Sequence, residues 1–146
     1  MTSVLVLDSE PVSLLAAKRY EGTTNRVRAF MQAHLDRGGL VVVPANVIAE
    51  TRRGARASNV DWVLDAHLIV DVDRAIAAQA GAILETAKRS SADLADATVA
   101  ATAALARATS VFVLTSERPT TSGPNDIETF VEPWRTKVIV KAISTL

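Results

Sequence analysis

The stretch Val4-Leu5-Val6-Leu7-Asp8 decides the fold, because four consecutive apolar residues run directly into a carboxylate. Short apolar runs of this kind are typical of strands buried on both faces of a parallel sheet. Similar runs occur at Leu40-Val41-Val42-Val43 and Val111-Phe112-Val113-Leu114, separated by segments with helical spacing. This alternation predicts an α/β domain with a central, mainly parallel β-sheet flanked by α-helices.

Glycines, prolines and the spacing of apolar residues indicate where the elements lie. The chain shows no internal repeat, low-complexity tract or linker, so we expect a single domain over residues 1–146. Residues 119–125 have the composition of a loop. The expected strands are 4–7, 40–43, 68–70, 111–114 and an edge strand at 138–140, and the expected helices are 10–20, 24–36, 44–54, 74–88, 93–107 and 126–131.

Composition narrows the possible functions of the chain. Its 16 basic and 16 acidic residues give a net charge of +0, which offers no general argument for nucleic-acid binding. Cysteine is absent, which excludes disulfides and thiolate metal sites and fits a cytoplasmic protein. No apolar run is long enough to span a membrane, and no signal peptide is evident. His34 and His67 lack metal-ligand spacing, and His34 falls on the apolar stripe of its helix.

Acidic residues follow the ends of the expected strands. Asp8 ends the first apolar run, Glu50 lies six residues after Pro44, and Asp93 and Asp96 open an Ala-rich helix. In an open parallel sheet, residues just beyond the carboxyl ends of the strands converge on one crevice. Carboxylates gathered there repel one another unless a cation shares them, and Mg²⁺ or Mn²⁺ favours oxygen ligands. The sequence therefore predicts a metal-dependent enzyme that acts on phosphate.

Each of these acids also has a purely structural explanation. Asp8 suits the N-cap of the next helix, and Glu50 could pair with a nearby arginine on the surface. Ser90 with Asp93 fits a capping box, and the helix dipole stabilises anions there. Capping explains one acid of this helix better than two, so we favour Asp96 as a metal ligand and Asp93 as a neighbour that binds or orients the metal.

A fourth acidic ligand has two candidates. Glu117 ends the run Leu114-Thr115-Ser116-Glu117, in which Thr115 and Ser116 could hold a metal-bound water or a phosphate oxygen. Asp126 is the competing carboxylate, although it could simply cap the short helix that follows. The number of metal ions stays open.

Four motifs together resemble those of a PIN-domain nuclease, in particular the VapC-type toxins of bacterial type II toxin–antitoxin modules. The resemblance covers nearly the whole chain, and the family's first three acids correspond to Asp8, Glu50 and Asp96. At the fourth position relatives usually carry Asp or Asn, whereas this chain has Glu117, and a later Asp of the family corresponds to Asp126, which lies further along the chain. The motifs are Val-Leu-Asp-Ser at 6–9, Val-Pro-Ala-Asn-Val-Ile-Ala-Glu at 43–50 followed by Arg53-Gly54, Asp-Leu-Ala-Asp-Ala-Thr-Val-Ala-Ala-Thr-Ala at 93–103, and Val-Leu-Thr-Ser-Glu at 113–117.

The resemblance implies a Mg²⁺- or Mn²⁺-dependent endoribonuclease that forms a homodimer and is inhibited by a cognate antitoxin inserted near the active site. A metal-activated water would displace the 3′ oxygen of RNA and leave a 5′ phosphate. Arg52, Arg53 and Arg56 follow Glu50 and are candidates for contacts to the RNA backbone, or else exposed helix charges.

Three other functions compete with this prediction. A receiver-like phosphoacceptor domain also gathers acids at strand ends, but this chain offers neither the paired acid nor the lysine that such a domain needs. A PIN-like binding module whose catalysis has lapsed is suggested by Glu117. A housekeeping RNA-processing nuclease of the same fold is barely distinguishable from a toxin by sequence.

Overall fold

The computed structural model describes residues 3–17, 22–116 and 126–146. Strands and helices alternate along most of the chain, as the sequence predicts. The strands are β1 (Ser3–Leu7), β2 (Leu40–Pro44), β3 (Leu68–Val70), β4 (Ser110–Thr115) and β5 (Val138–Ala142). The α-helices are α1 (Ser9–Ala16), α2 (Thr23–Asp36), α3 (Ala45–Thr51), α4 (Ala57–Asp65), α5 (Arg74–Ala87), α6 (Leu94–Leu105) and α7 (Asp126–Val131), with short 3-10 turns at Gly54–Arg56, Ser91–Asp93, Glu132–Trp134 and Ile143–Thr145.

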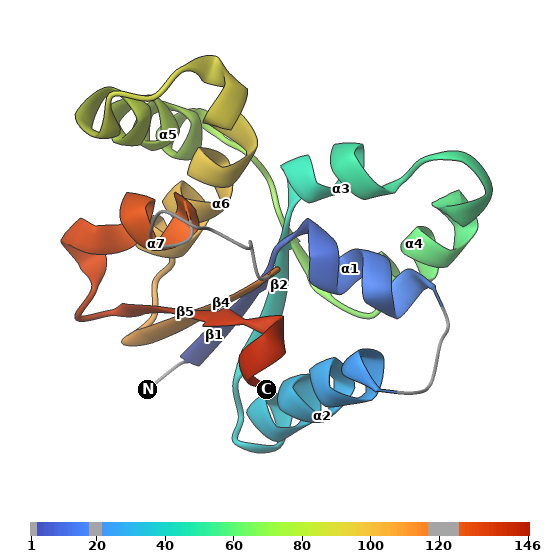
Figure 1. Cartoon of the computed structure of the whole chain (residues 1–146). Coiled ribbons are helices and arrows are strands. Elements are labelled where there is room, and N and C mark those ends of the chain that lie inside the picture. The colour runs from blue at the N-terminus through green and yellow to red at the C-terminus, as the bar shows by residue number, and fades with distance from the viewer. Residues whose placement is uncertain (1–2, 18–21, 117–125) are drawn as a thin grey trace.

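The sheet has the order β3-β2-β1-β4-β5, and every pairing in it is parallel. Helices α5, α6 and α7 lie on one side of the sheet, and α1, α2, α3 and α4 lie on the other (Figure 1). The sheet is therefore the middle layer of an α/β sandwich. This arrangement confirms the predicted fold class.

The chain changes direction of winding between β1 and β4. From β1 it moves outward to β2 and β3, and then returns to place β4 on the other side of β1. This makes the carboxyl ends of β1 and β4 a topological switch point, where open α/β sheets form their binding crevice. Asp8 directly follows β1, and Thr115 is the last residue of β4.

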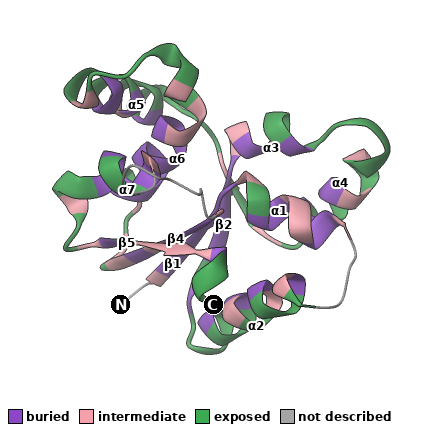
Figure 2. Cartoon of the chain, viewed as in Figure 1, coloured by how far each residue is buried: buried purple, intermediate pink, exposed green. Residues whose placement is uncertain are grey.

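The core is built from the central strands and the inward faces of the helices, whose outward faces are exposed (Figure 2). Leu5, Val6 and Leu7 of β1 are completely buried, as expected for a central strand covered on both faces. The alanines of α6 at 97, 100, 101 and 103 are equally buried. Small side chains let the α6 backbone lie close to the sheet, which holds the start of the helix firmly in place.

Several predicted boundaries differ from the structure. Pro44 is the last residue of β2 rather than the first of a helix, and α3 ends at Thr51, short of Gly54. The Ala-rich helix begins at Leu94, because Ser91–Asp93 forms a separate 3-10 turn. Helix α4 was not predicted, although Val60, Val63 and Leu64 have helical spacing and are buried. The predicted loop at 119–125 lies outside the described residues.

None of the helices in the described ranges is long and apolar enough to cross a membrane. His34 is buried at 3% exposure, which confirms it as a packed residue. Trp62 of α4 is 56% exposed.

Candidate functional site

Asp8 is fixed at the switch point by the neighbouring strand β4 and by the first residue of α1. Its backbone N–H donates to the carbonyl of Leu114 at 3.0 Å, which extends the β1–β4 ladder by one residue. Its Oδ1 accepts from the Ser9 backbone N–H at 2.8 Å, and its Oδ2 accepts from the Thr115 hydroxyl at 2.7 Å. The side chain thus caps α1, as one of its interpretations predicted, and is also a buried carboxylate at the crevice, with 6% exposure.

Glu50 lies at the same edge of the sheet as Asp8. It lies in the last turn of α3, which directly follows β2 and so begins at the same edge of the sheet as Asp8. Partial burial, followed by repulsion from Asp8 and from Asp96, raises the pKa of Glu50 above its ordinary value, although a hydrogen bond with Ser9 and the charge of Arg53 act in the opposite direction. The side chain keeps contact with water, so its loss of hydration is incomplete. Glu50 therefore lies close enough to Asp8 and to Asp96 for the charge of each to act on it.

Asp96 reaches the crevice from the opposite layer. It lies in the first turn of α6 and is half-buried. Helix α6 packs against α3, which brings residue 96 toward Glu50 from across the sheet edge. The three acids that the sequence favoured thus come from the ends of β1 and α3 and from the start of α6.

Asn46 is a polar neighbour of these acids that the sequence analysis missed. It lies one helical turn before Glu50, and its Nδ2 approaches Glu50 Oε1 at 3.4 Å and the Ala95 carbonyl at 3.3 Å. Its Oδ1 is enclosed and accepts no hydrogen bond from the part of the chain that the structure describes. The spacing of four residues from Glu50 was the available signal.

The residues at the crevice fit a hard divalent cation by their chemistry. Asp8, Glu50, Asp96 and the Oδ1 of Asn46 offer oxygen atoms, the ligands that Mg²⁺ and Mn²⁺ prefer. Among the described residues, however, no three acidic or histidine side chains are gathered closely enough to ligate one ion.

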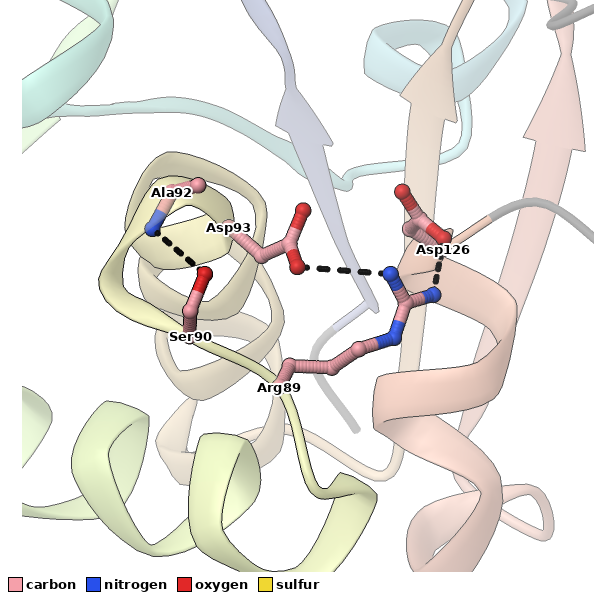
Figure 3. A network of polar contacts seen from close by, with 5 residues as sticks. All are labelled: Arg89, Ser90, Ala92, Asp93 and Asp126. Atoms are coloured by element: carbon pink, nitrogen blue, oxygen red, sulfur yellow. Dashed lines mark hydrogen bonds and ion pairs between the residues drawn. The ribbon is translucent and has the colours of Figure 1, made fainter.

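Asp93 and Asp126 belong to a different cluster, around Arg89 (Figure 3). The Nη1 of Arg89 lies 3.3 Å from Asp93 Oδ2, and its Nη2 lies 2.5 Å from Asp126 Oδ1. The Arg89 guanidinium also lies over the Phe130 ring, 5.6 Å from its centroid. Hydrogen bonding and attraction to Asp126, more than to Asp93, raise the pKa of Arg89, so its charge is permanent.

This pairing bears on the choice of the fourth acid. Asp126 is the first residue of α7, and its carboxylate bonds to Arg89. Glu117, the competing candidate, lies outside the described residues. Ser116 is half-buried at the end of β4, beside the buried Thr115.

The three candidate phosphate-binding arginines differ in their surroundings. Arg52 forms a two-point pair with Asp61 of α4, with Nε–Oδ1 at 2.8 Å and Nη2–Oδ2 at 3.0 Å. Arg53 donates to the Ala49 carbonyl at 3.2 Å and is exposed, and Arg56 is exposed as well. Arg53 and Arg56 are therefore better placed than Arg52 to contact a charged ligand.

Comparisons with known proteins give one line of support for the fold. No family model matches the sequence, and no curated protein matches it. Among solved structures, a toxin–antitoxin complex from Klebsiella pneumoniae is similar, with a TM-score of 0.60 and 19% sequence identity. The similarity covers 82% of this chain and 91% of that one. At this level of identity, it establishes the shared α/β fold.

Proposed function

We propose that this protein is the toxin of a type II toxin–antitoxin pair and acts as a divalent-metal-dependent endoribonuclease of the PIN-domain, VapC-like type. The main support is that the charges of Asp8 and Asp96 both act on Glu50 and contribute to its raised pKa. Like charges that share a partly dry crevice are typical of sites that bind a cation. The likeness to a chain of a toxin–antitoxin complex supports the biological setting.

The residues of the proposed site would have different roles. Asp8, Glu50 and Asp96 would hold a Mg²⁺ or Mn²⁺ ion, which supplies an activated water and neutralises charge on the scissile phosphate. Thr115 orients the Asp8 carboxylate, and Ser9 does the same for Glu50. Glu117 remains the proposed fourth acid.

RNA binding would rest on the basic surface beyond α3. Arg53 and Arg56 would contact the RNA backbone, which positions the strand without reading its sequence. Arg52 would help through its pairing with Asp61, which joins the end of α3 to α4. A cognate antitoxin and a second copy of this chain are the proposed protein partners.

Expression in a bacterial host tests this proposal. The parent protein should arrest growth, and Asp8→Asn or Asp96→Asn should relieve the arrest while the protein still accumulates. Asp36→Asn is the matched control, because Asp36 is an exposed aspartate on α2 that bonds to Gln32. Arrest that persists in both crevice variants would show that these acids are not the ligands.

Purified protein gives the chemical test. Labelled RNA should be cut with Mg²⁺ or Mn²⁺ and left intact with EDTA, and the products should carry 5′ phosphates. Cleavage of RNA in the presence of EDTA would rule out the metal-dependent mechanism.

A second candidate function is a PIN-like module that binds partners without cleaving RNA. It is favoured by the finding that, in the described ranges, no three acids are arranged to ligate one ion. This candidate predicts binding of RNA or antitoxin with no cleavage of any RNA at any metal concentration.

A further inference from the structure

Strand β5 forms one edge of the sheet. Among the described strands it pairs with β4 alone, and its other side is open (Figure 1). It has five residues, Val-Ile-Val-Lys-Ala, of which Ile139 is 45% exposed. An edge strand of this length and composition is a template for pairing with another chain, because half of its backbone groups have no neighbouring strand.

The hydrogen bonds to β4 show which residues of β5 use their backbone groups within the sheet. The Val111 N–H donates to the Lys137 carbonyl at 2.9 Å, so the carbonyl of Lys137 points toward β4. In a parallel pair, every second residue directs its N–H and C=O to the same neighbour. Ile139 and Lys141 therefore also bond to β4, in agreement with the register of the two strands.

The backbone groups of Val138, Val140 and Ala142 consequently point to the open edge. In the part of the chain that the structure describes, their N–H groups find no acceptor. The Ala142 carbonyl accepts from the Thr145 hydroxyl at 2.7 Å, which leaves a second lone pair available. This edge thus offers donors and acceptors at the spacing that an added strand needs.

A groove of about 440 Å³ runs beside the open edge and continues the same surface. Val138 and Val140 form its floor, and residues of α7 and of the turn after it form its wall. Glu132 and Arg135 also line it, and these two exposed side chains pair at 2.7 Å. A surface that meets a copy of itself across a two-fold axis must carry both signs of charge. This groove does so.

The lysines near β5 select one register for such a pairing. With an antiparallel two-fold at Val140, Ile139 of one copy lies opposite Lys141 of the second copy. A two-fold at Lys141 would set two lysines face to face, and one at Ile139 would set Lys141 opposite Lys137. Like charges directly opposite each other destabilise a pair of strands. A two-fold at Val140 avoids both, and it lets the two Val140 residues exchange N–H···O bonds.

We propose that β5 is the surface that binds a second copy of this chain, through antiparallel pairing of the two β5 strands about a two-fold at Val140. The two sheets then form one continuous sheet. The opposite edge, β3, is less suited, because it has three residues and is followed by Asp71 and Asp73. The inference rests on the homodimer in the proposed function and names its surface; it requires neither bound metal nor RNA cleavage.

The test measures the dimer dissociation constant of the full chain by analytical ultracentrifugation in EDTA. The parent should associate as its concentration rises. Val140→Pro removes an N–H that points to the open edge and not to β4, so it should give a folded monomer, with folding checked by circular dichroism.

Charge substitutions at residue 139 test the register. Ile139→Lys sets a positive charge opposite Lys141 of the second copy and should raise the dissociation constant about tenfold. Ile139→Glu faces the same lysine with the opposite charge and should not weaken the dimer. Adding Lys141→Glu to Ile139→Lys should restore association, because opposite charges again face each other. Leu68→Lys is the matched control at an exposed residue of β3 and should change nothing.

The possible results separate this proposal from the rest of the function. A dimer that both Val140→Pro and Ile139→Lys leave intact forms through another surface and overturns the proposal. If Val140→Pro does not fold, Ile139→Lys and its rescue by Lys141→Glu decide the question. A parent that stays monomeric at every concentration overturns this proposal together with the proposed homodimer. RNA cleavage is tested separately, so neither result counts against the nuclease.

Discussion

The hydroxyl of Thr115 donates a 2.7 Å hydrogen bond to Oδ2 of Asp8, although the two residues lie 107 positions apart in the sequence. The bond joins the ends of the two central strands, β1 and β4, across the switch point of the sheet. It gives a buried carboxylate a donor that water cannot supply there, and it fixes the direction in which Asp8 faces.

Thr115→Val tests the strength of this contact. Valine keeps the shape of threonine but removes the donor, so a charged group loses a buried partner. We expect the free energy of unfolding to fall by about 1–3 kcal/mol in urea titrations. Thr145→Val is the control, because Thr145 bonds to the Ala142 carbonyl on the surface and should change little. Equal effects of the two substitutions would mean that the Asp8 contact is weak.

Glu50→Gln tests the repulsion within the crevice. The substitution removes one negative charge near Asp8 and Asp96 and keeps the shape of the side chain. We expect a higher melting temperature than that of the parent in EDTA. Saturating Mn²⁺ should reverse the order, because the parent then gains a bound cation.

The control for this comparison is Glu85→Gln, at an exposed glutamate on α5. Its melting temperature should match that of the parent both in EDTA and in saturating Mn²⁺. A melting temperature of Glu50→Gln in EDTA at or below that of the parent would argue against like-charge strain at the crevice.

The lowered pKa of His67 predicts how the free energy of unfolding depends on pH. Burial lowers the pKa of His67 below its ordinary value of 6.5, so the folded protein takes up a proton less readily than the unfolded chain. Stability contributed by neutral His67 is therefore present above pH 6.5 and is lost as the pH falls below that value toward the folded pKa.

Urea titrations between pH 7.5 and 5 would check this, with His67→Gln as the comparison. The parent should lose stability more steeply than the variant as the pH falls. If the free energy of unfolding falls equally with pH in the parent and in His67→Gln, His67 does not contribute to the pH dependence.

The substitution Gly39→Ala tests how tightly the protein packs around His34. A Cβ at residue 39 would lie 2.2 Å from His34 Nε2, and the ring is held by the Ser3 carbonyl at 3.3 Å and by Phe112. Gly39→Ala should therefore cost about 1–3 kcal/mol through overpacking. Gly81→Ala on α5 meets no atom within 4 Å and should stabilise by about 0.5–1 kcal/mol. Thermal unfolding of both variants gives the comparison, and a harmless Gly39→Ala would mean that the ring can move.

Much of the fold was predictable from local patterns. The run ending at Asp8 is apolar enough to be a central strand, and Asp73 caps α5 by accepting a hydrogen bond from the Ile76 N–H at 2.8 Å. Helix α4 was missed because its apolar stripe is short and its exposed Trp62 obscures the two-sided pattern. Boundaries such as Pro44 depend on backbone hydrogen bonds that residue types indicate only loosely.

Part of the candidate site was also predictable from the sequence. Asp8, Glu50 and Asp96 could be grouped because parallel strands bring their carboxyl ends to one edge. The link between Arg89 and Asp126, 37 residues apart, could not be found in this way, since it depends on where α5 and α7 come to lie.

The sequence by itself determined the alternation of strands and helices and the location of carboxylates at their junctions, because hydrophobic periodicity and turn chemistry act between near neighbours. Tertiary structure alone decided how those carboxylates are divided. Asp93 and Asp126 pair with Arg89, while the charges of Asp8 and Asp96 act on Glu50. Electrostatic interaction depends on distance through space, and packing of the helices on the sheet sets that distance.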